Sequence, residues 1–64
     1  MIYKITITKT YGGYNANLND LWAVYASSIE EAKKYILGDI NYHLEKFGMP
    51  IVEMDSLEFT LPTN

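Results

Sequence analysis

The stretch IYKITITKTYGGYNANL, residues 2 to 18, decides the fold because it contains two alternating segments joined by a glycine pair. Residues 2–10 are rich in β-branched residues and alternate apolar with polar side chains, which is the pattern of a half-buried strand. Gly12 and Gly13 can adopt the positive φ angles of a tight hairpin turn. Beyond them the alternation resumes. The residues expected on the inner face are Tyr14, Ala16 and Leu18, with asparagines on the solvent face.

Two more strands are expected. Asn19 and Asp20 are turn residues, and they lead into LWAVYA, residues 21–26, a short aromatic segment that predicts a third strand. In that strand Trp22 and Val24 share one side. The segment LEFTL near the end of the chain alternates once more and predicts a last strand at residues 57–61. Its inward residues are expected to be Leu57, Phe59 and Leu61.

A single helix is predicted between the third and last strands, over residues 29–47. Ser28 and Glu31 have capping-box spacing, in which hydroxyl and carboxylate each satisfy a free amide at the helix start. Gly48 is placed to end the helix in a left-handed conformation, and Pro50 prevents its continuation. At about 100° per residue, the stripe facing the sheet comprises Ile29, Ala32, Ile36, Ile40, His43, Leu44 and Phe47, with Leu37 at its margin.

The elements give the order β-β-β-α-β in one domain of residues 1–64, an α+β fold with an antiparallel sheet and one helix on one face. A chain this short buries only about 60% of the surface that its unfolded form exposes. Disulfides, metals and self-association are the usual supports at this size. The chain has no cysteine and one histidine, so self-association is the support that remains. A homodimer formed through open sheet edges is therefore expected.

The charge pattern favours a protein partner over nucleic acid. Five lysines and no arginine oppose eight acidic residues, for a net charge of −3. Nucleic-acid binders normally carry a basic footprint with arginine forks, whereas an acidic surface suits a basic protein. The start MIYKITITKT lacks the pattern of a signal peptide, and no apolar run approaches the ~18 residues of a membrane span. We therefore expect a cytoplasmic protein.

No catalytic constellation is apparent. His43 has no nucleophile or carboxylate placed beside it by spacing, so a packed structural role is expected. The candidates for a metal-dependent nuclease site are the carboxylates of Asp20, Glu53, Asp55 and Glu58. Their predicted positions in a turn, before a strand and on an outward face do not converge. The sequence therefore predicts no enzyme activity, no metal and no cofactor.

The outward side of the helix is the candidate binding surface. Tyr35 and Tyr42 lie a heptad apart with Gly38 between them, and Glu31 and Glu45 flank the set. A glycine inside a helix costs about 1 kcal/mol relative to alanine, but it lets another backbone approach, and tyrosines are favoured in interface cores. Two interpretations stay open. The surface binds a partner or a second copy, or its tyrosines are single surface residues without such a role.

Several phrases along the chain resemble the HicB family of antitoxins, whose core is a small, partial RNase H-like fold. The first strand runs into GGY at residues 12–14, and the second runs into the pair Asp20-Leu21. The helix opens with SSIEEA at residues 27–32 and closes on HLEKFGMPI at residues 43–51. Their order and spacing together carry the resemblance.

The resemblance extends over residues 3–61 and implies an antitoxin that binds a small basic HicA-type toxin, an mRNA-cleaving ribonuclease, and blocks its RNA-binding surface. Two departures matter. Leu21 is followed by Trp22 and Ala23, where the family has Pro-Gly. Many members also continue into a DNA-binding segment of ribbon-helix-helix or helix-turn-helix type, whereas this chain stops at Asn64, so operator binding is not expected of it.

Other functions also fit the sequence. The same acidic fold suits a phage or mobile-element inhibitor that occupies the nucleic-acid surface of a host defence nuclease. A stand-alone HicB-fold homodimer with another binding role is a further alternative. Direct binding of single-stranded RNA by exposed aromatic residues of the sheet is another.

Overall fold

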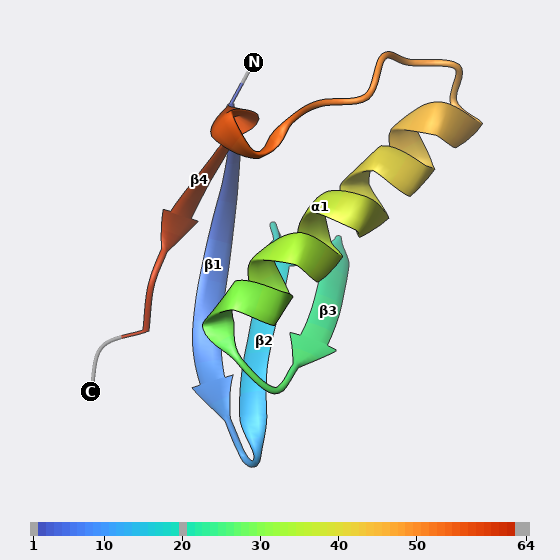
Figure 1. Cartoon of the computed structure of the whole chain (residues 1–64). Coiled ribbons are helices and arrows are strands. Elements are labelled where there is room, and N and C mark those ends of the chain that lie inside the picture. The colour runs from blue at the N-terminus through green and yellow to red at the C-terminus, as the bar shows by residue number, and fades with distance from the viewer. Residues whose placement is uncertain (1, 20, 63–64) are drawn as a thin grey trace.

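The computed structural model describes residues 2–19 and 21–62, which form a four-stranded sheet with one helix on one face (Figure 1). The elements are β1 (Tyr3–Thr10), β2 (Gly13–Leu18), β3 (Trp22–Ala26), α1 (Ile29–Lys46), the short 3-10 turn η1 (Met54–Ser56) and β4 (Leu57–Thr60). The predicted α+β class and the order β-β-β-α-β are confirmed. The predicted boundaries agree with the observed ones to about a residue, which is the usual uncertainty of such limits.

The sheet is mixed, with the strand order β3-β2-β1-β4. β1 and β2 pair antiparallel with Thr10 opposite Gly13, and β2 and β3 also pair antiparallel. β4 instead runs parallel to β1, with Tyr3 opposite Leu57, so the expected antiparallel sheet is corrected at this one pair. The cause is the crossover: α1 returns the chain to the end of the sheet where β3 began, and a strand starting there runs parallel to β3 and β1.

The core lies between the inner face of the sheet and α1. Its buried hydrophobic residues are Ile5, Ile7, Ala16, Leu18, Ala26, Ala32, Ile36, Ile40, Leu44 and Leu57. Trp22 and Val24 pack against this core from β3, on the shared side that the sequence predicted. Leu61 was expected to face inward, but β4 ends at Thr60 and Leu61 is exposed. The alternation that predicted its burial holds only while the strand continues.

The C-terminus of α1 closes as the sequence predicted. Gly48 has φ 72°, and its N–H donates to the Glu45 carbonyl over 3.0 Å. The N–H of Met49 donates to the Leu44 carbonyl over 2.9 Å. These two bonds form a Schellman motif, in which a left-handed residue turns the chain back and satisfies the last carbonyls of the helix.

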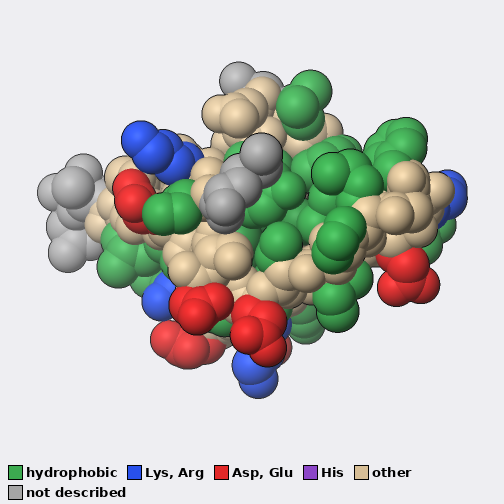
Figure 2. All heavy atoms as spheres, turned by 90° about the horizontal axis from the view of Figure 1, so that it is seen from above, with side chains coloured by type: hydrophobic (Ala, Val, Ile, Leu, Met, Phe, Trp, Pro, Cys, Tyr) green, Lys and Arg blue, Asp and Glu red, His purple; other side chains and the backbone are tan. Residues whose placement is uncertain are grey.

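Phe47 departs from the predicted inward stripe, because it is 75% exposed. α1 has 18 residues, which corresponds to a length of about 27 Å. β3 has 5 residues and spans only about 17 Å. The helix therefore extends beyond β3, and its last turn has no strand beneath it (Figure 1). Figure 2, which looks onto this end, shows hydrophobic side chains gathered there.

Asn41 holds the connection from α1 to β4 against the helix through two hydrogen bonds. The Asn41 Nδ2 donates to the Val52 carbonyl over 2.9 Å, and the Val52 N–H donates to Asn41 Oδ1 over 2.8 Å. An asparagine side chain thus pairs with one backbone residue as a second strand would. This clamp directs the chain across the end of the molecule toward η1 and the start of β4 (Figure 1).

Glycine is needed at the two hairpin positions for different reasons. Gly12 has the positive φ, 83°, that was predicted for the turn, but Gly13 does not share it. Gly13 is required by close approach, since a Cβ there would lie 2.5 Å from the Ala26 carbonyl oxygen and 2.7 Å from the Tyr25 hydroxyl. That hydroxyl also donates to the Tyr11 carbonyl over 3.4 Å. The Tyr25 ring therefore covers the glycine and braces the turn.

Gly13→Ala is expected to lower the free energy of unfolding by about 1–3 kcal/mol, because the added methyl group has to displace the β3 backbone or the Tyr25 ring. Gly38→Ala is the matched control: a Cβ at Gly38 meets nothing within 4 Å. It should raise the free energy of unfolding by about 1 kcal/mol through helix propensity. Urea titrations followed by circular dichroism measure both. A Gly13→Ala variant as stable as the parent chain would contradict the close approach.

Asn41→Leu is expected to lower the free energy of unfolding by about 1–3 kcal/mol, because it removes both hydrogen bonds to Val52 at similar volume. The amide proton of Val52 should then exchange with solvent much faster in NMR hydrogen-exchange measurements. Asn41→Asp is the control, since it keeps the acceptor for the Val52 N–H and loses only the donor. Unchanged protection of Val52 in Asn41→Leu would show that the clamp does not hold the connection.

Candidate partner-binding surface

The outer face of α1, defined here as Tyr35, Gly38, Tyr42 and Glu45, is the surface on which the predicted binding residues gather. All four are exposed, while the residues facing the sheet are buried. Tyr35 and Tyr42 are 49% and 58% exposed. The cause is the helical period, which turns positions 35, 38, 42 and 45 away from the apolar stripe. The structure therefore brings four of the five predicted residues together on solvent.

The spacing of this face leaves room for a partner. Tyr35 and Tyr42 are two turns apart, which separates their Cα atoms by about 10 Å along the axis. Gly38 lies between them with open space over its backbone. An element crossing α1 at this glycine would approach its backbone closely, with a tyrosine ring on each side. Helix-to-helix distances of about 8–10 Å depend on how small the residues at the crossing are.

Glu31, the fifth predicted residue, is engaged in capping the helix. The Ser28 hydroxyl accepts from the Glu31 N–H over 3.2 Å, as the capping box predicts. The Glu31 carboxylate, however, accepts from the Ser27 N–H over 3.3 Å and from the Ser27 hydroxyl, rather than from the N–H of the cap residue Ser28. Its negative charge also lies in the first turn of α1, where it interacts favourably with the helix dipole. A partner would meet a carboxylate that is already hydrogen-bonded.

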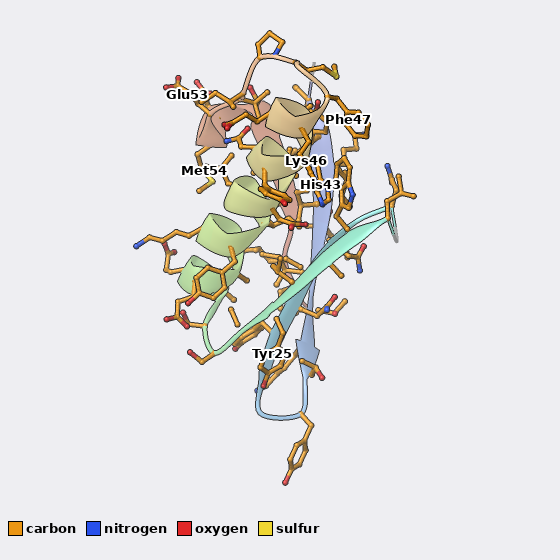
Figure 3. The ribbon with its side chains drawn as sticks, turned by 90° about the vertical axis from the view of Figure 1, so that its right-hand side faces the viewer. Tyr25, His43, Lys46, Phe47, Glu53 and Met54 are labelled. Carbon is orange, nitrogen blue, oxygen red and sulfur yellow. The ribbon has the colours of Figure 1, made fainter. Side chains whose placement is uncertain are left out.

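His43 lies at the boundary between the core and the outer face. Its ring stacks on Trp22 with centroids 4.7 Å apart and an interplanar angle of 6°. The Tyr42 ring meets it edge-on at 5.5 Å, and the Asp39 carboxylate lies 3.8 Å from its Nε2. Figure 3 shows His43 beside Lys46, whose ammonium lies 5.2 Å from the centroid of the Tyr42 ring. The histidine has the packed, half-buried position expected of it, and it supports one side of Tyr42. The expectation that spacing places no carboxylate beside it is wrong, because Asp39 lies one helical turn before it.

The carboxylates considered for a metal site do not come together where they are described. Glu53 and Asp55 are exposed around η1, and Glu58 lies on the uncovered face of the sheet opposite Lys4. Asp20 lies outside the described residues. Within residues 2–19 and 21–62 no three His, Asp or Glu side chains are placed to hold a metal ion. In the same ranges no helix is both long and apolar enough to cross a membrane.

The uncovered face of the sheet is polar, with Thr, Asn, Lys and Glu side chains. Its described residues are Lys4, Thr6, Thr8, Thr10, Asn15, Asn17, Ala23, Tyr25, Glu58 and Thr60. Tyr25 supplies the aromatic ring of this described set, and it lies against Gly13 near the hairpin end (Figure 3). RNA-binding sheets stack two or three bases on several rings. One braced ring does not form such a platform.

Comparisons with known proteins give no match. A scan against protein-family models, a search of curated proteins and a search of solved structures each find no match to this chain.

The double substitution Tyr35→Ala with Tyr42→Ala is expected to leave the free energy of unfolding within about 1 kcal/mol of the parent, because surface side chains contribute about 0.5 kcal/mol or less each. The neighbouring Ile36 is fully buried. Ile36→Ala is therefore the control, with an expected loss of about 2–5 kcal/mol. Thermal and urea unfolding measure the difference. An equal loss in both variants would mean that the tyrosines are part of the core.

Proposed function

We propose that this chain is a non-enzymatic cytoplasmic inhibitor that binds a basic protein, and that it acts as a HicB-like antitoxin against a small HicA-type mRNA-cleaving toxin. The observation that carries the proposal is the outer face of α1, where two half-exposed tyrosines flank a glycine with open space above it. The rings offer area and hydroxyl groups, and the glycine offers close approach. Tyrosine is among the residues that dominate binding energy at interfaces.

Charge supports a basic partner. The chain carries a net charge of −3 and no arginine. A ribonuclease has to attract the phosphates of its RNA, so the surface around its active site is basic. Opposite net charges accelerate encounter between such proteins. On the outer face itself, Glu45 is the exposed carboxylate, and Lys46 rests over the Tyr42 ring.

The positions of the HicB-like phrases also support the proposal. GGY lies at the turn between β1 and β2, SSIEEA covers the capped start of α1, and the glycine of HLEKFGMPI ends α1 in its Schellman motif. Each phrase therefore occupies a junction between elements. Each phrase alone is a general turn or capping signal, so it is their order and spacing together that support the proposal.

Co-expression with a HicA-type toxin tests the proposal. The parent chain should restore growth and bind the purified toxin. Tyr35→Ala and Tyr42→Ala should each weaken binding by about thirtyfold, the effect of losing a central interface tyrosine. Gly38→Ala should weaken binding while raising the stability of the free chain. Tyr11→Ala is the control, since Tyr11 is a fully exposed tyrosine at the hairpin tip, away from the outer face of α1, and its substitution should leave affinity unchanged.

Two outcomes would count against this function. Absence of both growth rescue and binding would reject the toxin as partner, and capture of a host nucleic-acid-binding enzyme through the same tyrosines would favour the mobile-element inhibitor. Full rescue by the Tyr35→Ala, Tyr42→Ala double variant would instead retain an antitoxin and reject the outer face of α1 as its binding surface.

A further inference from the structure

One end of the molecule exposes five large hydrophobic side chains, which we call the apolar end. They are Ile2 (61% exposed), Leu21 (74%), Phe47 (75%), Met49 (51%) and Ile51 (61%). Figure 2 looks onto this end and shows hydrophobic side chains spread over it. Met54 is also exposed, but it lies outside the apolar end, on the other side of α1 from Phe47 (Figure 3).

The topology explains why residues so far apart in sequence meet at this end. β1 and β3 are both antiparallel to β2, so they start at the same end of the sheet. Ile2 directly precedes β1, and Leu21 directly precedes β3. α1 runs back from the other end, which brings its last turn and the following connection over the same place (Figure 1).

The exposure of this connection is not the result of a loose loop. Met49 is held by its N–H bond to the Leu44 carbonyl, and Val52, next to Ile51, is held by both bonds of the Asn41 clamp. The segment is therefore tied at both ends while its apolar side chains point to solvent. A surface that is already ordered loses little conformational entropy when a partner covers it.

The area matches half of a small protein interface. At roughly 150–250 Å² for a fully exposed large side chain, the five leave on the order of 600 Å² uncovered. For comparison, the largest contiguous apolar patch on an ordinary monomer is about 300–600 Å². Two such patches facing each other would bury about 1,200 Å² from these side chains alone, which reaches the range of stable complexes before any surrounding residue is counted.

We infer that the apolar end is the interface of a homodimer, with a second copy of this chain as its occupant. A closed twofold dimer needs a patch that is complementary to itself, and an uncharged apolar patch meets that condition. Two copies of net charge −3 repel each other where their carboxylates face. The five side chains carry no charge, so this end lets two acidic molecules approach. A basic partner would gain nothing electrostatic from these five side chains.

This inference does not depend on the proposed function, because the outer face of α1 uses different residues. It also differs from the dimer through open sheet edges that the small size of the chain predicted. The two dimers are separable by substitution. Edge pairing depends on backbone groups of β3 or β4, which side-chain changes at the apolar end leave intact.

Sedimentation equilibrium tests the inference on the whole chain. The parent should be a dimer at roughly 100 µM, and Phe47→Ser with Ile51→Ser should raise its dissociation constant at least about thirtyfold. Tyr11→Ser is the matched control. Tyr11 is fully exposed at the hairpin tip, at the other end of a molecule 38 Å long, and its substitution should change nothing. A monomeric parent, or a double variant that dimerises like the parent, would overturn the inference, the latter in favour of edge pairing.

A cysteine scan gives an independent readout, because the natural chain has no cysteine. Phe47→Cys and Met49→Cys should each form a covalent dimer with a short bis-maleimide linker in dilute solution, and Tyr11→Cys should remain monomeric. Because these side chains are exposed, circular dichroism should show that every variant stays folded. Cross-linking of Tyr11→Cys as fast as that of Phe47→Cys would mean that the contacts are random collisions, and the inference would fail.

Discussion

The rest of the structure depends on the burial of one helical stripe against one face of the sheet. Ala32, Ile36 and Ile40 are fully buried by it, and Leu44 nearly so. A single helix covers only part of a four-stranded sheet, and α1 lies over the β2 and β3 side (Figure 1). β4 is therefore only partly covered: the Phe59 ring is half-buried, with the Lys33 ammonium 5.2 Å from its centroid. The lysine stem shields apolar surface that a second helix would cover in a larger domain.

The same helix also determines where the apolar end forms. Because α1 is longer than the strands beneath it, its last turn and the following connection have no sheet to pack on. The chain could lose this connection to disorder, but the Schellman bonds and Asn41 fix its course. Polar contacts thus fix a segment whose apolar side chains stay in water. Hydrophobic burial accounts for the core, and backbone-directed hydrogen bonds account for the shape of this end.

Local periodicity predicted most of the fold. Alternation located the strands, the 3.6-residue period located α1, and Ser28 and Gly48 marked its ends. These signals lie within a few residues of one another. The parallel pairing of β4 was missed because pairing partners are distant in sequence, and the position of Phe47 was missed because periodicity gives the direction of a side chain and not the length of the sheet below it.

The helical period that located α1 also predicted the candidate surface. Once the inward stripe is known, the outward positions of Tyr35, Gly38 and Tyr42 follow from geometry. The environment of Glu31 did not follow, because a carboxylate at that position can reach Ser27 as easily as Ser28. The Asn41 clamp and the stack of Trp22 on His43 join distant segments, and no local pattern of polar residues signals them.

The outer face of α1 and the apolar end share one property, which is that neither is required for folding. In a domain of 64 residues the margin of stability is a few kcal/mol, and a glycine inside α1 removes about 1 kcal/mol of it. Folding alone requires neither Gly38 nor an ordered apolar end. The proposed recognition would use both, since one allows close approach and the other can be covered. If two copies join at their apolar ends, the dimer carries two outer faces of α1, and a partner with two sites would bind it with the advantage of effective concentration.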